Sequence, residues 1–169
     1  MAKLAHWLGV AAVAVLATAC KTPQPAWMQD GMQAPHLSGL TADGQPVDLG
    51  EQRGKVVAVV FFADWCPHCR ALYEDERELS SRCKGGQLVM IGVVADNTPE
   101  EIRSAVRRER VTWPVIYDAD GHNSAAWGVT VLPTVYVLDG NGTIRRYALS
   151  DSAVVETVDA LIKDANATR

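Results

Sequence analysis

An apolar run that leads directly into a pair of cysteines limits the folds open to this 169-residue chain. Val56–Ala63 is apolar throughout, which is typical of a strand buried on both faces of a parallel sheet. Residues 67–82 are mostly polar, with Leu72 and Leu79 seven positions apart, as on one face of a helix. The motif Cys66-Pro67-His68-Cys69 therefore lies where a buried strand passes into a helix.

Strands and helices alternate along the rest of the chain. Thr98-Pro99-Glu100-Glu101 has the N-cap, early proline and acidic residues of a helix start. Asp43-Gly44 and Asp139-Gly140-Asn141-Gly142 mark the turns of two hairpins, the first of which ends near Leu49. Between and beyond these turns we expect strands at 56–63, 88–95, 115–117, 134–138 and 143–148, and helices at 67–82, 98–110, 122–127 and 154–165. This order predicts an α/β sandwich in which helices flank a central mixed sheet.

The first nineteen residues have the composition of an export signal. Lys3 supplies a positive charge, Leu4–Ala19 is apolar apart from two residues, and small residues precede Cys20. The ending Leu16-Ala17-Thr18-Ala19-Cys20 resembles the lipobox of bacterial lipoproteins, which implies that Cys20 is lipidated after cleavage. Two alternatives stay open: an ordinary secretory signal beside a spare thiol, and a transmembrane helix, for which the stretch is short.

The segment that follows Cys20 has several prolines and little periodicity, as in an extended tether. We therefore predict a signal peptide at 1–19, a lipid-anchored linker at 20–34 and one domain at 35–165. Such a protein is membrane-anchored and faces the periplasm, where disulfide chemistry is available. The net charge of −4 disfavours nucleic acid as a partner, because phosphate binding needs a concentrated basic surface.

The cysteine motif has the layout of a redox-active dithiol. At a helix N-terminus, free backbone N–H groups and the helix dipole stabilise a thiolate, so we expect the pKa of Cys66 to fall. Pro67 suits the first helical turn because it has no N–H to lose, and a protonated His68 would add positive charge. Cys69 lies one turn further on and can reach Cys66, which gives an attacking thiol and a resolving thiol.

Spacing disfavours other roles for the cysteines. A zinc site needs two further ligands, and only Cys83, His36 and His122 are available, without a second pair. An inert disulfide would not need a helix start that stabilises a thiolate. Cys83 lies fourteen residues after Cys69, which is about 21 Å along a helix. We expect it to be a small buried side chain rather than a bridging partner.

Three landmarks resemble the thioredoxin superfamily over residues 35–165. Gly54-Lys55-Val56-Val57, Phe62-Ala63-Asp64-Trp65-Cys66 and Leu132-Pro133-Thr134 are similar to those of TlpA/ResA-type extracytoplasmic thiol-disulfide oxidoreductases. The resemblance implies a thioredoxin-like fold with an extra α-β unit at 98–118. It also implies a cis Pro133 beside Cys66, with the Leu132 backbone and the Trp65 side chain facing a substrate.

The chain departs from this family at two places. Pro67-His68 is the dipeptide of DsbA-type oxidases, whereas TlpA/ResA members usually have x-Pro between the cysteines. Val60 stands where thioredoxins have a buried acid, and we expect the downstream acids Glu74 and Asp75 to be solvated. The proton acceptor of Cys69 is therefore unassigned. The scaffold suggests a reductant and the dipeptide an oxidant, so the direction of electron flow stays open.

The sequence thus predicts a membrane-tethered enzyme that exchanges thiols and disulfides with protein substrates. Cys66 and Cys69 exchange bonds, Pro67 and His68 tune the thiolate, and no metal or organic cofactor is required. A membrane-bound redox partner recycles the pair. The alternative is a lipoprotein that binds a metal such as copper through Cys66, Cys69 and His68. The Pro-x-x-x-Thr-x-x-Cys pattern of peroxiredoxins is absent around Cys66, which disfavours a peroxidase.

Overall fold

A five-stranded mixed sheet forms the centre of the protein. The computed structural model describes residues 28–81, 85–95, 97–148 and 152–167. The sheet has the strand order β5-β4-β3-β6-β7, in which β3, β4 and β5 are parallel and β6 and β7 are antiparallel to their neighbours. Its strands are β3 (Val56–Phe62), β4 (Leu88–Val94), β5 (Val115–Tyr117), β6 (Thr134–Leu138) and β7 (Ile144–Ala148).

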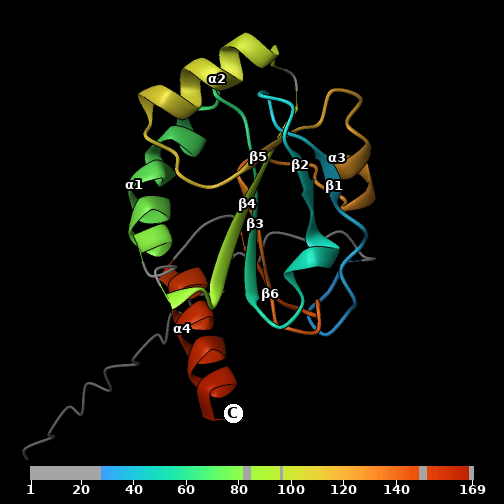
Figure 1. The fold of residues 1–169 in the computed structure, drawn as a ribbon, viewed down its shortest axis with the longest axis vertical. Coiled ribbons are helices and arrows are strands. Elements are labelled where there is room, and N and C mark those ends of the chain that lie inside the picture. Colours follow the sequence, from blue (N-terminus) through green and yellow to red (C-terminus); the bar gives the residue numbers. More distant parts are fainter. Residues whose placement is uncertain (1–27, 82–84, 96, 149–151, 168–169) are drawn as a thin grey trace, which may run out of the picture.

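Alternating side chains of the sheet build two hydrophobic layers. Val56, Ala58 and Val60 point to one layer, which also contains residues of α1 (Pro67–Ser81), α2 (Pro99–Arg108) and α4 (Ser152–Ala167). Val57 and Val59 point to the other, which contains Trp127 just after α3 (His122–Ala126). Figure 1 shows α1 and α4 on one side of the sheet, and α3 with the N-terminal hairpin on the other. Because β3 is buried on both faces, its residues can be apolar at every position.

The N-terminal hairpin caps one edge of the sheet. Its strands β1 (Ser38–Leu40) and β2 (Pro46–Asp48) pair antiparallel, and a short 3₁₀ helix, η1 (Leu49–Gln52), follows them. A single bridge joins Thr41 to Ile116, so the hairpin lies against the edge strand β5. The predicted fold class, the hairpin and the element order are therefore confirmed.

The inserted helix α2 is shorter than its sequence pattern predicts. The expected end is near Arg110, but the helix ends at Arg108. Glu109 closes it by donating its N–H to the Ala105 carbonyl at 2.8 Å, and Arg110, which donates to the Arg107 carbonyl at 3.3 Å, takes a left-handed φ of 55°. A residue in that conformation just beyond a helix is a common way to end it.

Part of the predicted linker packs against the domain. Met28 is only 2% exposed and joins the core layer on the α3 side. Gly31 donates its N–H to the Ile144 carbonyl at 2.7 Å, and Ala34 donates to Gly142 at 2.9 Å. Residues 28–34 thus belong to the packed domain rather than to a free tether. The predicted signal peptide, Cys20 and Cys83 lie outside the described residues.

No helix within the described part of the chain has the length and apolar character needed to cross a bilayer.

Candidate active site

The cysteine motif lies on a tight turn between β3 and α1. Ala63 follows β3, and its carbonyl accepts the Cys66 N–H at 3.2 Å, which closes a four-residue turn. The Cys66 carbonyl then accepts the N–H of Arg70 at 3.2 Å, as the first bond of a helix does. The helix begins at Pro67, which confirms the predicted place for a residue that lacks an N–H. Cys66 therefore occupies the N-cap position.

The two sulfur atoms are close and both are reduced. Cys66 and Cys69 are free thiols and are 5% and 2% exposed. The backbone N–H of Cys69 donates to the Cys66 Sγ at 3.4 Å. A sulfur that accepts an N–H at a helix start is stabilised as a thiolate.

The surroundings move the pKa values of the two thiols in opposite directions. Burial alone would raise the pKa of Cys66, but hydrogen bonds from the Cys69 thiol and from the backbone of Cys69 and His68 outweigh it. The positive charge of Arg70 adds to these, so the pKa of Cys66 falls below its ordinary value. Burial raises the pKa of Cys69, and the Cys66 sulfur and the Glu76 carboxylate raise it further. Cys66 is the more acidic thiol, as the sequence predicts.

The loop before β6 lies beside Cys66. The Leu132–Pro133 peptide bond is cis, as expected from the resemblance. The Cys66 Sγ lies 3.9 Å from the Leu132 carbonyl oxygen, which joins the motif to a segment 66 residues later. Trp65, which precedes Cys66, and Val131, which precedes Leu132, are 59% and 47% exposed, so each of the two segments carries an exposed apolar side chain.

A buried carboxylate orients the segment that leads to this loop. Asp118 is 2% exposed and follows β5 directly. It accepts hydrogen bonds from Asn123 and Ser124, through both their backbone N–H groups and their side chains, at 2.7–3.1 Å. These bonds fix the start of α3, and the chain runs from α3 into the Leu132–Pro133 loop.

Several residues near the motif escape sequence reasoning. Glu76 is 8% exposed, and its carboxylate raises the pKa of Cys69. Glu74 and Asp75, which the sequence predicts to be solvated, have side chains outside the described set. The spacing Cys69, Tyr73, Glu76 follows one helical face, so a projection from Cys69 could have found Glu76. The imidazole of His68 is exposed, and it is the His68 backbone that bonds to Cys66.

Within the described residues, no group of three or more His, Cys, Asp and Glu side chains is arranged to hold a metal ion.

A mixed sheet, a dithiol at a helix start and a cis-proline loop beside it define a protein of the thioredoxin-like class. The chain belongs to the redoxin family, whose model matches residues 29–162. It is a TlpA/ResA-like thiol-disulfide oxidoreductase, which confirms the predicted family and class of reaction.

Two relatives and one solved structure illustrate the similarity. The chain is 30% identical over 125 residues to the thioredoxin-like protein YneN of Bacillus subtilis, covering 70% of each chain. It is 27% identical over 117 residues to the thiol-disulfide oxidoreductase ResA of Bacillus thuringiensis, covering 69% of this chain and 68% of the relative. A thiol:disulfide interchange protein from Chlorobium tepidum has the same fold, with a TM-score of 0.71 at 22% identity over 80% of this chain and 99% of that one.

Proposed function

We propose that Cys66 and Cys69 perform thiol–disulfide exchange with protein substrates outside the cytoplasm. The observation that supports this best is the place of Cys66 at the start of α1, where its Sγ accepts the Cys69 N–H at 3.4 Å; the lowered pKa of Cys66 and the raised pKa of Cys69 agree with it. A stabilised thiolate at Cys66 is both the better nucleophile at neutral pH and the better leaving group. Cys69 then serves as the resolving thiol, because it is buried one turn away.

The reaction transfers two electrons between the Cys66–Cys69 pair and a cysteine pair of the substrate. In the reducing direction, the Cys66 thiolate attacks a substrate disulfide, forms a mixed disulfide and releases one substrate thiolate. Cys69 loses its proton, attacks the Cys66 sulfur and releases the second substrate thiolate. The enzyme dithiol is thereby oxidised to the Cys66–Cys69 disulfide, and the substrate disulfide is reduced to two thiols. The oxidising direction is the same sequence reversed.

Substrate binding is assigned to the surface around Cys66. The exposed side chains of Trp65, next to Cys66 in the chain, and of Val131, next to Leu132, offer apolar contact to a substrate. Leu132 and Pro133 pass beside Cys66 and can receive an extended substrate segment by backbone hydrogen bonding. Pro67 tunes the pair by starting the helix, and His68 by presenting its backbone N–H to the sulfur.

The proposed location of the protein rests on its N-terminal sequence. The signal-like segment 1–19 and the lipobox-like ending support export and a lipid anchor at Cys20. A lipid anchor would hold the cysteine pair near the membrane surface, so the proposal includes a membrane-bound redox partner that recycles the pair. Cys20→Ser is expected to release the protein from the membrane fraction, and a lipid-free wild type would contradict the anchor.

Trapping of the mixed disulfide tests the catalytic assignment. The Cys69→Ser variant should accumulate a covalent complex with a disulfide-bonded substrate such as insulin, and reductant should release it. Cys66→Ser should form none, and Cys83→Ser is the matched control that should turn over normally. A complex formed equally by Cys66→Ser would overturn the assignment.

The reduction potential of the pair decides the direction. A potential near that of thioredoxin, about −270 mV, indicates a reductant, and one near that of DsbA, about −120 mV, indicates an oxidant.

A further inference from the structure

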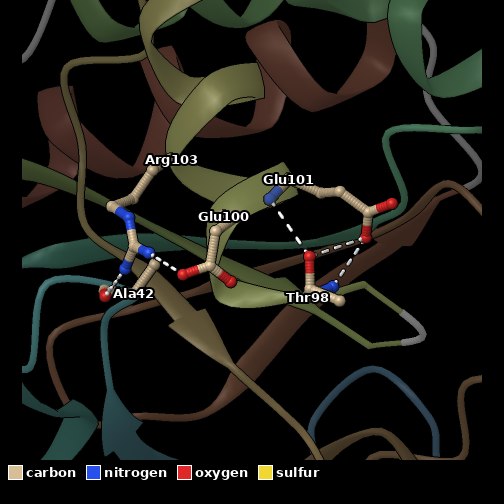
Figure 2. A network of polar contacts seen from close by, with 5 residues as sticks. All are labelled: Ala42, Thr98, Glu100, Glu101 and Arg103. Atoms are coloured by element: carbon tan, nitrogen blue, oxygen red, sulfur yellow. Dashed lines mark hydrogen bonds and ion pairs between the residues drawn. The ribbon is translucent and has the colours of Figure 1, made fainter.

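The inserted helix α2 is fixed to the N-terminal hairpin near its start. Thr98 and Glu101 cap each other, with the Thr98 N–H 2.7 Å from Glu101 Oε2 and the Glu101 N–H 3.3 Å from Thr98 Oγ1. One turn further, Arg103 pairs with Glu100 and donates to the Ala42 carbonyl at 2.6 Å (Figure 2). Ala42 lies in the loop between β1 and β2, so this part of α2 is tied to the hairpin.

The other end of α2 is tied to the cysteine motif. Arg108, its last residue, forms an ion pair with Asp64, and its Nε donates to the Glu109 carboxylate at 2.8 Å. Arg77 of α1 donates to the Glu109 backbone carbonyl at 3.0 Å, which fixes the same end of α2 to α1. Figure 1 shows α2 lying across the end of the molecule where α1 begins. The ion pair between Arg108 and Asp64 joins residues 44 positions apart in the sequence.

Asp64 occupies the turn that places Cys66 at the helix start. It is the second residue of the turn closed by the bond from the Cys66 N–H to the Ala63 carbonyl. Since consecutive Cα atoms are 3.8 Å apart, the Cα atoms of Asp64 and Cys66 lie within about 7.6 Å. The Asp64 side chain is 24% exposed, so water screens its charge only in part. An unpaired carboxylate at this place opposes a thiolate at Cys66.

We propose that Arg108 is a positioning residue for the cysteine motif: by pairing with Asp64 it fixes the turn before Cys66 and cancels a negative charge beside its thiolate. The inference rests on the proposed function, in which Cys66 is the nucleophile. It gives the inserted α-β unit a part in the reaction, at a point remote in sequence from both cysteines.

Other charged and titratable groups surround the motif. Arg70 and His68 lie on α1 beside Cys66, Cys69 lies one turn along, and Glu109 shares Arg108 with Asp64. Residues 128–133, before β6, carry no charged side chain. The Asp64–Arg108 pair is thus one of several influences, and its share must be measured by changing each partner in turn.

The test measures the pKa of Cys66 in the full-length chain, from the pH dependence of its alkylation rate followed by peptide mass spectrometry. Arg108→Gln should raise this pKa by about 0.4, which is the effect of one unscreened charge in water when the ~7.6 Å limit on the Asp64–Cys66 Cα spacing is taken as the distance to the sulfur. Asp64→Asn should lower it, and the double variant should return close to the wild type. Arg108→Lys keeps the charge and should retain the wild-type value. Arg103→Gln, which breaks a similar pair on the same helix, should leave it unchanged.

If the pair acts by cancelling charge, Arg108→Gln and Asp64→Asn shift the pKa of Cys66 in opposite directions. If the contact is purely structural, losing either partner disturbs Cys66 in the same way. The inference is overturned if Arg108→Gln leaves the pKa of Cys66 within 0.1 of wild type, or if Arg103→Gln shifts it as much. A wild-type Cys66 that fails to form mixed disulfides would instead count against the proposed function, since the differences between variants can be measured either way.

Discussion

The Asp118 carboxylate should be among the largest single contributors to stability outside the apolar core. It accepts four hydrogen bonds, from Asn123 N at 3.0 Å, Asn123 Nδ2 at 3.1 Å, Ser124 N at 2.8 Å and Ser124 Oγ at 2.7 Å. Gly121, the N-cap of α3, has no side chain to cap that helix. Asp118 therefore provides the acceptors that a five-residue helix lacks at its start.

Removing the Asp118 carboxylate lowers the free energy of unfolding, because the N–H and O–H groups that donate to it lose their acceptor. Hydrogen bonds to a charged group contribute about 1.5–3 kcal/mol each, but neighbouring donors share one carboxylate and regain some water when it is lost. We expect Asp118→Ala to lower the free energy of unfolding by about 3–4 kcal/mol, near the upper end for a single substitution. Asp118→Asn keeps one acceptor oxygen and should cost about 2 kcal/mol.

Urea unfolding of the oxidised protein, followed by circular dichroism, measures both values. Asp120→Ala is the matched control, because Asp120 is exposed and accepts a single N–H, from His122 at 3.0 Å. It should cost less than about 1 kcal/mol. A loss below about 1 kcal/mol for Asp118→Ala, or an equal loss for both variants, would refute the reasoning.

Three further predictions concern two buried tyrosines and the pair of thiols. Tyr73→Phe removes a buried hydroxyl that has no hydrogen-bond partner among the described residues, and should keep or raise the unfolding free energy. Tyr136→Phe breaks the bond to the Trp127 carbonyl at 2.7 Å and should cost about 1–2 kcal/mol in the same urea assay. For the reduced protein, the lowered pKa of Cys66 adds stability that is lost as pH falls through that pKa, whereas the raised pKa of Cys69 adds stability that is lost above about pH 8.5. Stability of the reduced protein relative to a Cys66→Ala/Cys69→Ala variant should therefore peak near pH 8.5, and a flat difference from pH 6 to 10 would contradict these shifts.

Local sequence signals were sufficient for the fold and the position of the motif. The apolar run at 56–63 and the Thr98–Glu101 capping pattern act over a few residues, so their outcome can be predicted without knowing the tertiary structure. Pro67 marks the first helical residue for the same reason. The cis Leu132–Pro133 bond is implied by the family resemblance, because no local pattern in the sequence indicates it.

The contacts around the motif depend on which elements pack together. Arg108 and Asp64 meet only because α2 folds across the start of α1, and no periodicity in either segment indicates this. Glu76 is buried near Cys69 because of the face that α1 turns to the sheet, which its polar composition conceals. Residues 28–34 look like a free linker, since the apolar contact of Met28 and the backbone bonds to β7 leave no pattern in a short segment.

The acidity of one thiol in the reduced protein tests the account most directly. Alkylation rates of Cys66 and Cys69, resolved by peptide mass spectrometry across pH 4 to 10, give a separate pKa for each. We predict that Cys66 titrates clearly below the ordinary cysteine value of about 8.5, and that Cys69 stays protonated well above it. A Cys66 that titrates at or above about 8.5, or together with Cys69, would contradict the central claim.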